Sequence, residues 1–177
     1  MELSRRLREQ VCGDIVAFDG KTHRRTGTKA NNALPMHNAW SVENRLVLGQ
    51  MAVEEKSNEI TAVPQLMDML DLKGCVVTAD ALNCQKAVAA KAIEKKADYL
   101  LALKANHQVL FDEVSAYMDA LSEQSPPGFE QVEKDHGRIE TRRCWLSASV
   151  DWHADTAEWQ GLRSVVLFAS IRARGAT

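Results

Sequence analysis

Short apolar segments alternate with polar, loop-forming stretches along the first two thirds of the chain. One apolar run covers residues 14–19 and ends in Asp19, and a second covers residues 75–80 and ends in Asp80. A short apolar run bounded by turn-forming residues is typical of a buried strand. Both acids are therefore expected at strand ends, where a sheet meets solvent.

The other predicted elements follow from the same patterns. Further strands are predicted at residues 34–42, 45–53, 98–104, 129–135, 138–148 and 164–171. Helices are predicted at residues 57–73, 85–96 and 107–121, where apolar positions recur at helical spacing. The clearest break in the chain is Ser125-Pro126-Pro127-Gly128, because proline and glycine interrupt regular structure.

This order of elements predicts an α/β fold. Alternation of strand, helix and strand implies parallel pairing, whereas the three leading strands, joined by short turns, imply an antiparallel meander. We expect a ribonuclease-H-like mixed sheet, in which three antiparallel strands precede parallel strand-helix units, with a β-rich C-terminal extension. A plain doubly wound sheet is the alternative. The expected domains are a lead-in at 1–12, a core at 13–124 and the extension at 125–177.

Composition narrows the class of protein. The 177 residues are 45% hydrophobic and 26% charged, which is typical of a soluble globular protein. The net charge of −2 means that any contact with nucleic acid must come from local patches. No apolar run approaches the roughly 20 residues of a membrane span. The first residues also lead into no secretory apolar segment, so we expect a cytoplasmic protein.

The four cysteines do not predict a zinc site. None of them forms a CxxC pair, and no closely spaced histidine pair accompanies them. Reduced, buried thiols are the expected state in a protein without a secretion signal. Cys84 follows Asp80 closely, and lining a site there is its alternative role.

The pairing of Asp19 with Asp80 carries the predicted chemistry. If their strands are parallel neighbours, both acids lie at the carboxyl edge of the sheet, where ligands of open α/β sheets bind. Adjacent carboxylates repel each other unless a proton or a cation lies between them. Oxygen ligands with open positions suit Mg²⁺ or Mn²⁺, and such a site can cleave phosphodiesters. The structural alternative is a turn at Asp19-Gly20 and a helix cap at Asp80.

Several cationic side chains are candidates for phosphate contacts with DNA. They are Lys21, Arg24 and Arg25 after the first acid, Lys104 at the end of the third core strand, and Arg138 and Arg142 in the extension. A solvated loop, a surface lysine and cross-strand charge pairs that include Glu140 are the respective alternatives. A P-loop is excluded, because Ile15 stands where its first glycine is required.

Several segments of the chain resemble motifs of a known protein family. They are residues 15–22, 39–41, 55–60, 78–81, 103–107 and 136–142. In this order they resemble the DDE-type insertion-sequence transposases, and in particular the H-repeat-associated transposase group found beside Rhs elements in bacteria. The likeness covers about residues 13 to 168.

The resemblance implies a ribonuclease-H-like fold and three carboxylates that bind Mg²⁺ or Mn²⁺ for DNA strand cleavage and transfer. Asp19 matches the first catalytic aspartate of the family and Asp80 the second. The third family acid is a glutamate in a motif resembling His-Trp-x-Ile-Glu-Asn, which does not occur here. Glu140 lies in the β region inserted into the family fold and is a poor match. The chain thus looks like a family core shortened at both ends.

We therefore predict a DDE-type DNA transposase, present as a truncated copy that lacks the third carboxylate. Its expected partner is DNA at insertion-sequence ends, and no association with a membrane is expected. The full-length protein is expected to form a homodimer. The alternative is a catalytically inactive transposase remnant that at most binds DNA. A small-molecule α/β enzyme would need a glycine-rich phosphate loop, which the sequence lacks.

Overall fold

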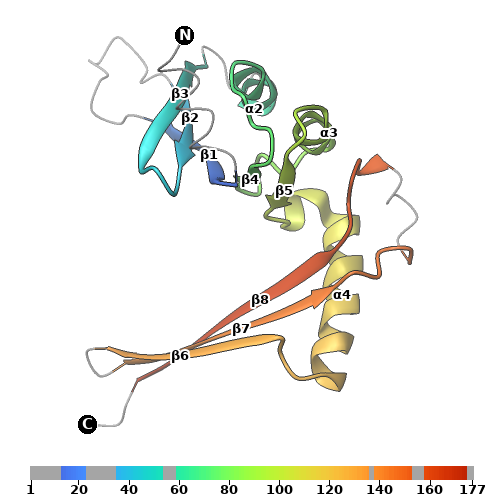
Figure 1. Ribbon diagram of the computed structural model, residues 1–177. Coiled ribbons are helices and arrows are strands. Elements are labelled where there is room, and N and C mark those ends of the chain that lie inside the picture. The colour runs from blue at the N-terminus through green and yellow to red at the C-terminus, as the bar shows by residue number, and fades with distance from the viewer. Residues whose placement is uncertain (1–12, 23–34, 54–58, 136–137, 153–157, 175–177) are drawn as a thin grey trace, which may run out of the picture. The chain divides into compact units, whose positions relative to one another are not determined.

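The protein forms two compact units, which are described separately here. A computed structural model describes residues 13–22, 35–53, 59–135, 138–152 and 158–174 (Figure 1). The first unit comprises Met1–Asn106 with Glu158–Gly161, and the second comprises His107–Ala157 with Leu162–Thr177.

A five-stranded mixed sheet forms the centre of the first unit. Its strands are β1 (Ile15–Thr22), β2 (Pro35–Ser41), β3 (Leu46–Ala52), β4 (Val76–Ala79) and β5 (Asp98–Leu101), in the order β3-β2-β1-β4-β5. β2 runs antiparallel to both β1 and β3, whereas β4 runs parallel to both β1 and β5. The antiparallel β2 rules out the plain doubly wound alternative, and the mixed sheet that the strand pattern predicts is confirmed.

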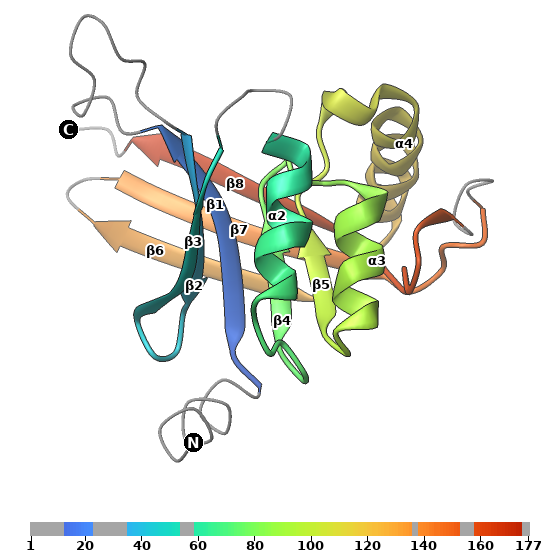
Figure 2. The ribbon, with the colours of Figure 1, turned by 90° about the horizontal axis from the view of Figure 1, so that it is seen from above.

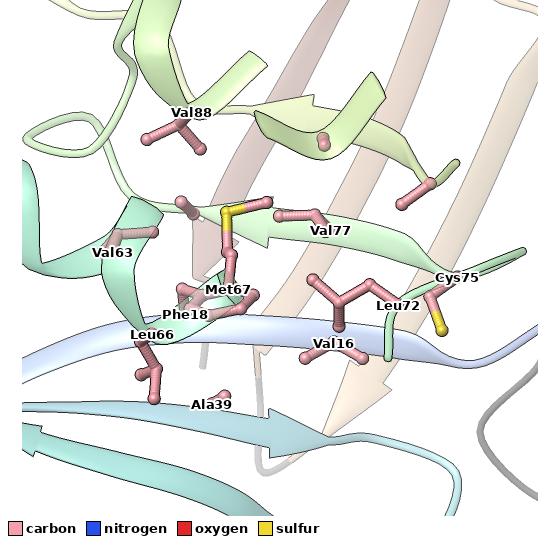
Figure 3. Packing of buried hydrophobic residues seen from close by; sticks show 13 residues of the cluster. Val16, Phe18, Ala39, Val63, Leu66, Met67, Leu72, Cys75, Val77 and Val88 are labelled. Carbon is pink, nitrogen blue, oxygen red and sulfur yellow. The ribbon is translucent and has the colours of Figure 1, made fainter. Parts of the chain in front are cut away.

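Two helices cover one face of this sheet. They are α2 (Glu59–Asp68) and α3 (Lys86–Glu94), which pack against each other and against the strands (Figure 2). Phe18 from β1, Leu66 from α2 and Val88 from α3 are buried in the shared core (Figure 3). Burying each such side chain stabilises the fold by about 1.5–3 kcal/mol. The apolar positions that predicted these elements are the ones that form the core.

β1 is longer than the sequence predicts, because its pairing with β2 continues beyond the point where its pairing with β4 ends. The predicted strand stops at Asp19, whereas β1 continues to Thr22. Its parallel ladder with β4 ends at the pair Phe18–Ala79, but its antiparallel ladder with β2 continues to the pair Thr22–Pro35. Asp19 therefore follows the end of the β1–β4 ladder and lies within the strand, which corrects its placement at the strand tip.

The second unit combines a long helix with a three-stranded antiparallel sheet. The helix is α4 (Gln108–Gln124), and the strands are β6 (Phe129–Asp135), β7 (Arg138–Ser147) and β8 (Val165–Arg174), in the order β6-β7-β8. Within this unit, α4 packs against β7 and β8. The Tyr117 hydroxyl lies 2.7 Å from Ser147 Oγ, which joins α4 to β7.

Candidate functional site

Asp19 and Asp80 each follow the last pair of the β1–β4 ladder in the first unit. That pair is Phe18 with Ala79; β1 continues through Asp19, whereas β4 ends at Ala79 and Asp80 begins the loop that follows. Successive residues of a strand project to opposite faces of a sheet. Because Phe18 projects into the helix-covered core, Asp19 projects to the opposite face. Asp19 is half-buried and Asp80 is exposed.

Asp80 is held in place by Asn83. The backbone N–H and the side-chain Nδ2 of Asn83 both donate to Asp80 Oδ1, at 3.2 and 3.0 Å. Within the described segments, no hydrogen bond involves the other carboxylate oxygen, Oδ2. The hydrogen bonds therefore fix one oxygen of Asp80 and leave the other for a ligand.

Asn83 itself is unusual in its burial. Only 1% of its surface is exposed, and its Oδ1 has no hydrogen-bond partner among the described residues. A buried polar atom without a partner is rare in proteins and is often associated with function. The sequence indicates only a helix-capping role for Asn83, since a position three residues after an aspartate suits a local turn. A second asparagine supports the same loop, because Asn106 Nδ2 donates to the Ala81 carbonyl at 2.7 Å.

The donor chemistry of this site suits a hard divalent cation. Two carboxylates that follow the ends of one parallel ladder, with an oxygen of Asp80 left for a ligand, resemble the partial ligand sets that Mg²⁺ occupies while keeping several waters. The described residues contain no group of three or more acidic, histidine or cysteine side chains that could hold a metal. Asp19 and Asp80 thus fit a metal ion as a pair. Their roles as ligands remain a prediction.

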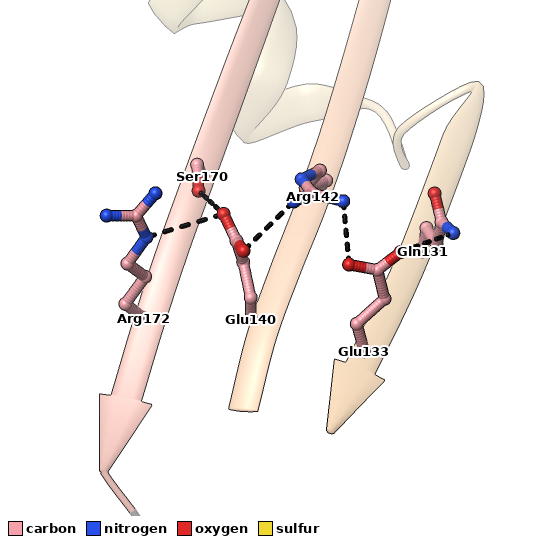
Figure 4. A network of polar contacts seen from close by, with 6 residues as sticks. All are labelled: Gln131, Glu133, Glu140, Arg142, Ser170 and Arg172. Atoms are coloured by element: carbon pink, nitrogen blue, oxygen red, sulfur yellow. Dashed lines mark hydrogen bonds and ion pairs between the residues drawn. The ribbon is translucent and has the colours of Figure 1, made fainter. Parts of the chain in front are cut away.

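Glu140, the sequence-level candidate for a third acid, lies in the second unit and is engaged by neighbours there. Ser170 Oγ donates to its Oε1 at 2.8 Å, and Arg142 Nη2 donates to its Oε2 at 3.0 Å (Figure 4). Arg172 also approaches Oε1, at 3.4 Å. The Ser170 hydrogen bond and the two guanidinium groups lower the pKa of Glu140, against the opposing effect of burial. Oε1 therefore joins β7 to β8, and Oε2 is engaged by Arg142 within β7.

The cationic candidates differ in their ion pairing, exposure and position in the strands. Arg142 bridges Glu140 and Glu133, with its Nη1 2.8 Å from Glu133 Oε2, so cross-strand charge pairs explain its position. Arg138 and Lys104 are exposed, and Lys104 follows the end of β5 at Leu101 instead of closing the strand. The backbone of Lys21 is part of β1. Arg24 and Arg25 lie outside the described residues.

Cys84 does not fit a site role. The thiol is buried, and burial raises the pKa of Cys84 to about 11. A thiol with such a pKa is protonated at neutral pH, and it is the thiolate that binds metal or attacks a substrate. The expectation of a buried, reduced cysteine therefore fits the structure at this position.

The helices of the described segments include none that is long and apolar enough to cross a bilayer.

The chain belongs to the DDE transposase family, whose model, described as "Transposase DDE domain", matches residues 11–167. This match confirms the family resemblance seen in the sequence. Divalent metal use is general in this family.

Individual relatives agree with the family assignment. The "Uncharacterized protein in dhlA 3'region" of Xanthobacter autotrophicus is 46% identical over 168 residues, which are 92% of this chain and 57% of that protein. "Putative transposase YncI" of Escherichia coli O157:H7 is 41% identical over 177 residues, covering 97% of this chain and 45% of that protein. "H repeat-associated putative transposase YhhI" of Escherichia coli K12 is 38% identical, covering 90% and 43%. The chain thus spans about half the length of these curated relatives.

Proposed function

We propose that this chain carries the catalytic core of a DDE transposase, which cleaves DNA strands and transfers them at insertion-sequence ends. Its five-stranded sheet is a ribonuclease-H-like centre, a proposal supported by the strand order β3-β2-β1-β4-β5 and by the antiparallel β2. The observation that carries the proposal is the β1–β4 register, whose last pair, Phe18 with Ala79, immediately precedes Asp19 and Asp80.

Asp19 and Asp80 would hold Mg²⁺ or Mn²⁺, and the bound ion would activate the attacking water or hydroxyl and stabilise the leaving oxygen. Asn83 orients Asp80 by occupying its Oδ1 with two hydrogen bonds. The phosphates of the DNA are neutralised by cations, for which Lys21, Lys104 and Arg138 are candidates. Such contacts fix the position of the DNA without reading its sequence.

Cleavage of the DNA that flanks the reading frame tests this proposal. Labelled duplexes carrying the terminal repeats would be incubated with the chain and Mg²⁺ or Mn²⁺, alongside Asp19→Asn and Asp80→Asn. Both variants should abolish cleavage, because each removes a ligand charge. Asp98→Asn is the matched control, since Asp98 is an exposed acid at the amino end of β5 in the same sheet. Cleavage that survives both site substitutions would refute the metal role.

A catalytically inactive remnant that binds DNA is the second candidate. It is favoured by the lack of a third acid beside the pair within the described residues and by the engagement of Glu140 in charge pairs. This candidate predicts Mn²⁺ binding and salt-dependent DNA binding without cleavage. Calorimetry with Mn²⁺ and a duplex-binding series at increasing salt would measure the two kinds of binding, and the cleavage assay would separate this candidate from the active enzyme. The homodimer of a full-length protein also remains a prediction.

A further inference from the structure

A row of three polar positions crosses the first sheet at the level of Asp19. Gln50 on β3 pairs with Asn38 on β2, and Asn38 pairs with Asp19 on β1. Side chains at paired positions share one face of a sheet, so these three project to the face opposite the helix-covered core. Asp80 follows Ala79, the last residue of β4 that pairs with β1.

A hydrogen bond within this row orients Asn38. Gln50 Nε2 donates to Asn38 Oδ1 at 2.7 Å, which directs the amide oxygen of Asn38 toward β3. The NH₂ group of Asn38 is then the end of the amide that remains for the β1 side. Directly opposed residues of an antiparallel pair have Cβ atoms about 4.5–5.5 Å apart, a separation at which an asparagine can reach a carboxylate.

The same structure contains a precedent for an asparagine that serves a site acid. Asn83 donates its side-chain amide to Asp80 at 3.0 Å and leaves the other carboxylate oxygen for a ligand. Asn38 is the residue directly opposite Asp19, and its oxygen is already taken by Gln50.

From these contacts we infer that Asn38, oriented by Gln50, is a positioning residue for Asp19. Its NH₂ group would donate to the Asp19 carboxylate when a cation is bound, which would direct the other oxygen of Asp19 toward that cation. This inference rests on the proposed metal site. Hydrogen-bond partners of metal ligands set the orientation of those ligands, and their loss typically weakens metal binding about 10–100-fold.

The affinity of the full chain for added Mn²⁺ tests the inference without relying on cleavage. Asn38→Ala should weaken binding about tenfold, because it removes the donor to Asp19. Gln50→Met should weaken binding by a smaller factor, since it removes the donor that orients Asn38 without changing charge. In the Asn38→Ala background, Gln50→Met should have no further effect, because Gln50 acts through Asn38. Gln65→Met on α2 is the matched control, an exposed glutamine on the helix layer over the other sheet face.

Asn38→Asp distinguishes positioning from a general structural role. A carboxylate at this position adds an oxygen ligand beside Asp19, so Mn²⁺ affinity should rise and the Mn²⁺ electron paramagnetic resonance spectrum should change. A structural role alone predicts lower thermal stability for both Asn38 variants, with equal Mn²⁺ affinity and an unchanged spectrum, and that result would overturn the inference. Failure of the unaltered chain to bind Mn²⁺ would instead overturn the proposed metal site, and with it the inference that rests on that site.

Discussion

Asn83 places two hydrogen-bond donors on one oxygen of Asp80, its backbone N–H at 3.2 Å and its side-chain Nδ2 at 3.0 Å. This contact spans only three residues, so the loop after β4 orients its own acid. The amide oxygen of Asn83 is buried and has no partner in the described part of the chain. Such an arrangement gives up some stability for a fixed carboxylate, because an unsatisfied buried polar atom costs about 1–3 kcal/mol.

The first prediction separates the effect of Asn83 on the stability of the fold from its effect on Asp80. Asn83→Leu keeps the branching and the number of heavy atoms of the side chain, removes the unpartnered oxygen and removes one donor to Asp80. We expect the free energy of unfolding to change by less than about 1 kcal/mol, because a lost hydrogen bond and a lost buried polar atom offset each other. Mn²⁺ affinity should fall about tenfold, because the carboxylate loses its orientation. Urea unfolding and calorimetry measure the two quantities. A loss of stability at constant Mn²⁺ affinity would contradict this account.

The second prediction concerns Gly20, which follows Asp19 on β1. A Cβ atom at Gly20 would lie 2.9 Å from Cε1 of His37, the opposed residue on β2. His37 is buried, with 2% of its surface exposed, and its ring cannot move aside without disturbing the core. Gly20→Ala should therefore lower the free energy of unfolding by about 1–3 kcal/mol.

A double variant checks this explanation. In the His37→Ala background the ring is absent, so Gly20→Ala should cost much less than in the unaltered chain. Urea unfolding of the two single variants and the double variant gives the coupling energy directly. If Gly20→Ala cost the same in both backgrounds, steric conflict with His37 would not be its cause.

Some of this arrangement could be predicted from the sequence. The apolar runs before Asp19 and Asp80 predict buried strands, and strand–helix alternation predicts their parallel pairing, which the structure confirms. Both inferences depend on local patterns and on general rules of connection. The position of each acid relative to the β1–β4 ladder follows from them.

Other features depend on contacts that no local pattern encodes. Residues 20–22 contain Gly, Lys and Thr, which favour a loop, yet they stay extended because β2 pairs with them. The contact of Gln50 with Asn38 depends on the β2–β3 register, which shifts by one residue between Ala39 and Trp40. A register shift reverses the face of every later side chain, so the alternation of polar residues in the sequence does not predict this pair.

The third prediction concerns Asp14, a buried acid just before β1. Ser41 Oγ and Asn44 Nδ2 donate to its Oδ2, and the Glu43 N–H donates to its Oδ1 at 2.9 Å. Burial acts to raise the pKa of Asp14, but these hydrogen bonds together lower it below its ordinary value. The hydrogen bonds thus favour the charged carboxylate and join the start of β1 to the β2–β3 turn.

A lowered pKa fixes the sign of the pH dependence. The stabilisation from Asp14 is fully present above the pKa of an unfolded aspartate, about pH 4, and is lost as the pH falls through the lower folded value. Asp14→Asn should therefore lower the free energy of unfolding by about 1–3 kcal/mol at pH 7, and by less at pH 2. Urea unfolding at both pH values measures this, with Asp119→Asn, an exposed acid on α4, as control. An equal loss at both pH values would contradict a role for the charge.

The fourth prediction concerns Arg142 and DNA. Arg142 is bridged to Glu133 and Glu140, so its charge is already neutralised within the β6–β7–β8 sheet. The combined variant Glu133→Gln and Glu140→Gln would release Arg142 and remove two negative charges from this sheet face. Binding to duplex DNA should strengthen, and the plot of log affinity against log salt should steepen by about one to two units, because Arg142 and Arg172 both lose an acidic partner and can then contact phosphate.

Two comparisons isolate the contribution of Arg142 to that change. Asp119→Asn with Glu123→Gln removes the same charge from exposed positions on α4, so it measures the effect of net charge alone. Adding Arg142→Met to the Glu133 and Glu140 variant should reduce the salt slope by about one unit. If the steeper slope persisted without Arg142, the released cation would lie elsewhere, and the acids would act on DNA binding through general repulsion. If the slope never changed, the exposed sheet face would not contact DNA, and the charge pairs would serve only to align its strands.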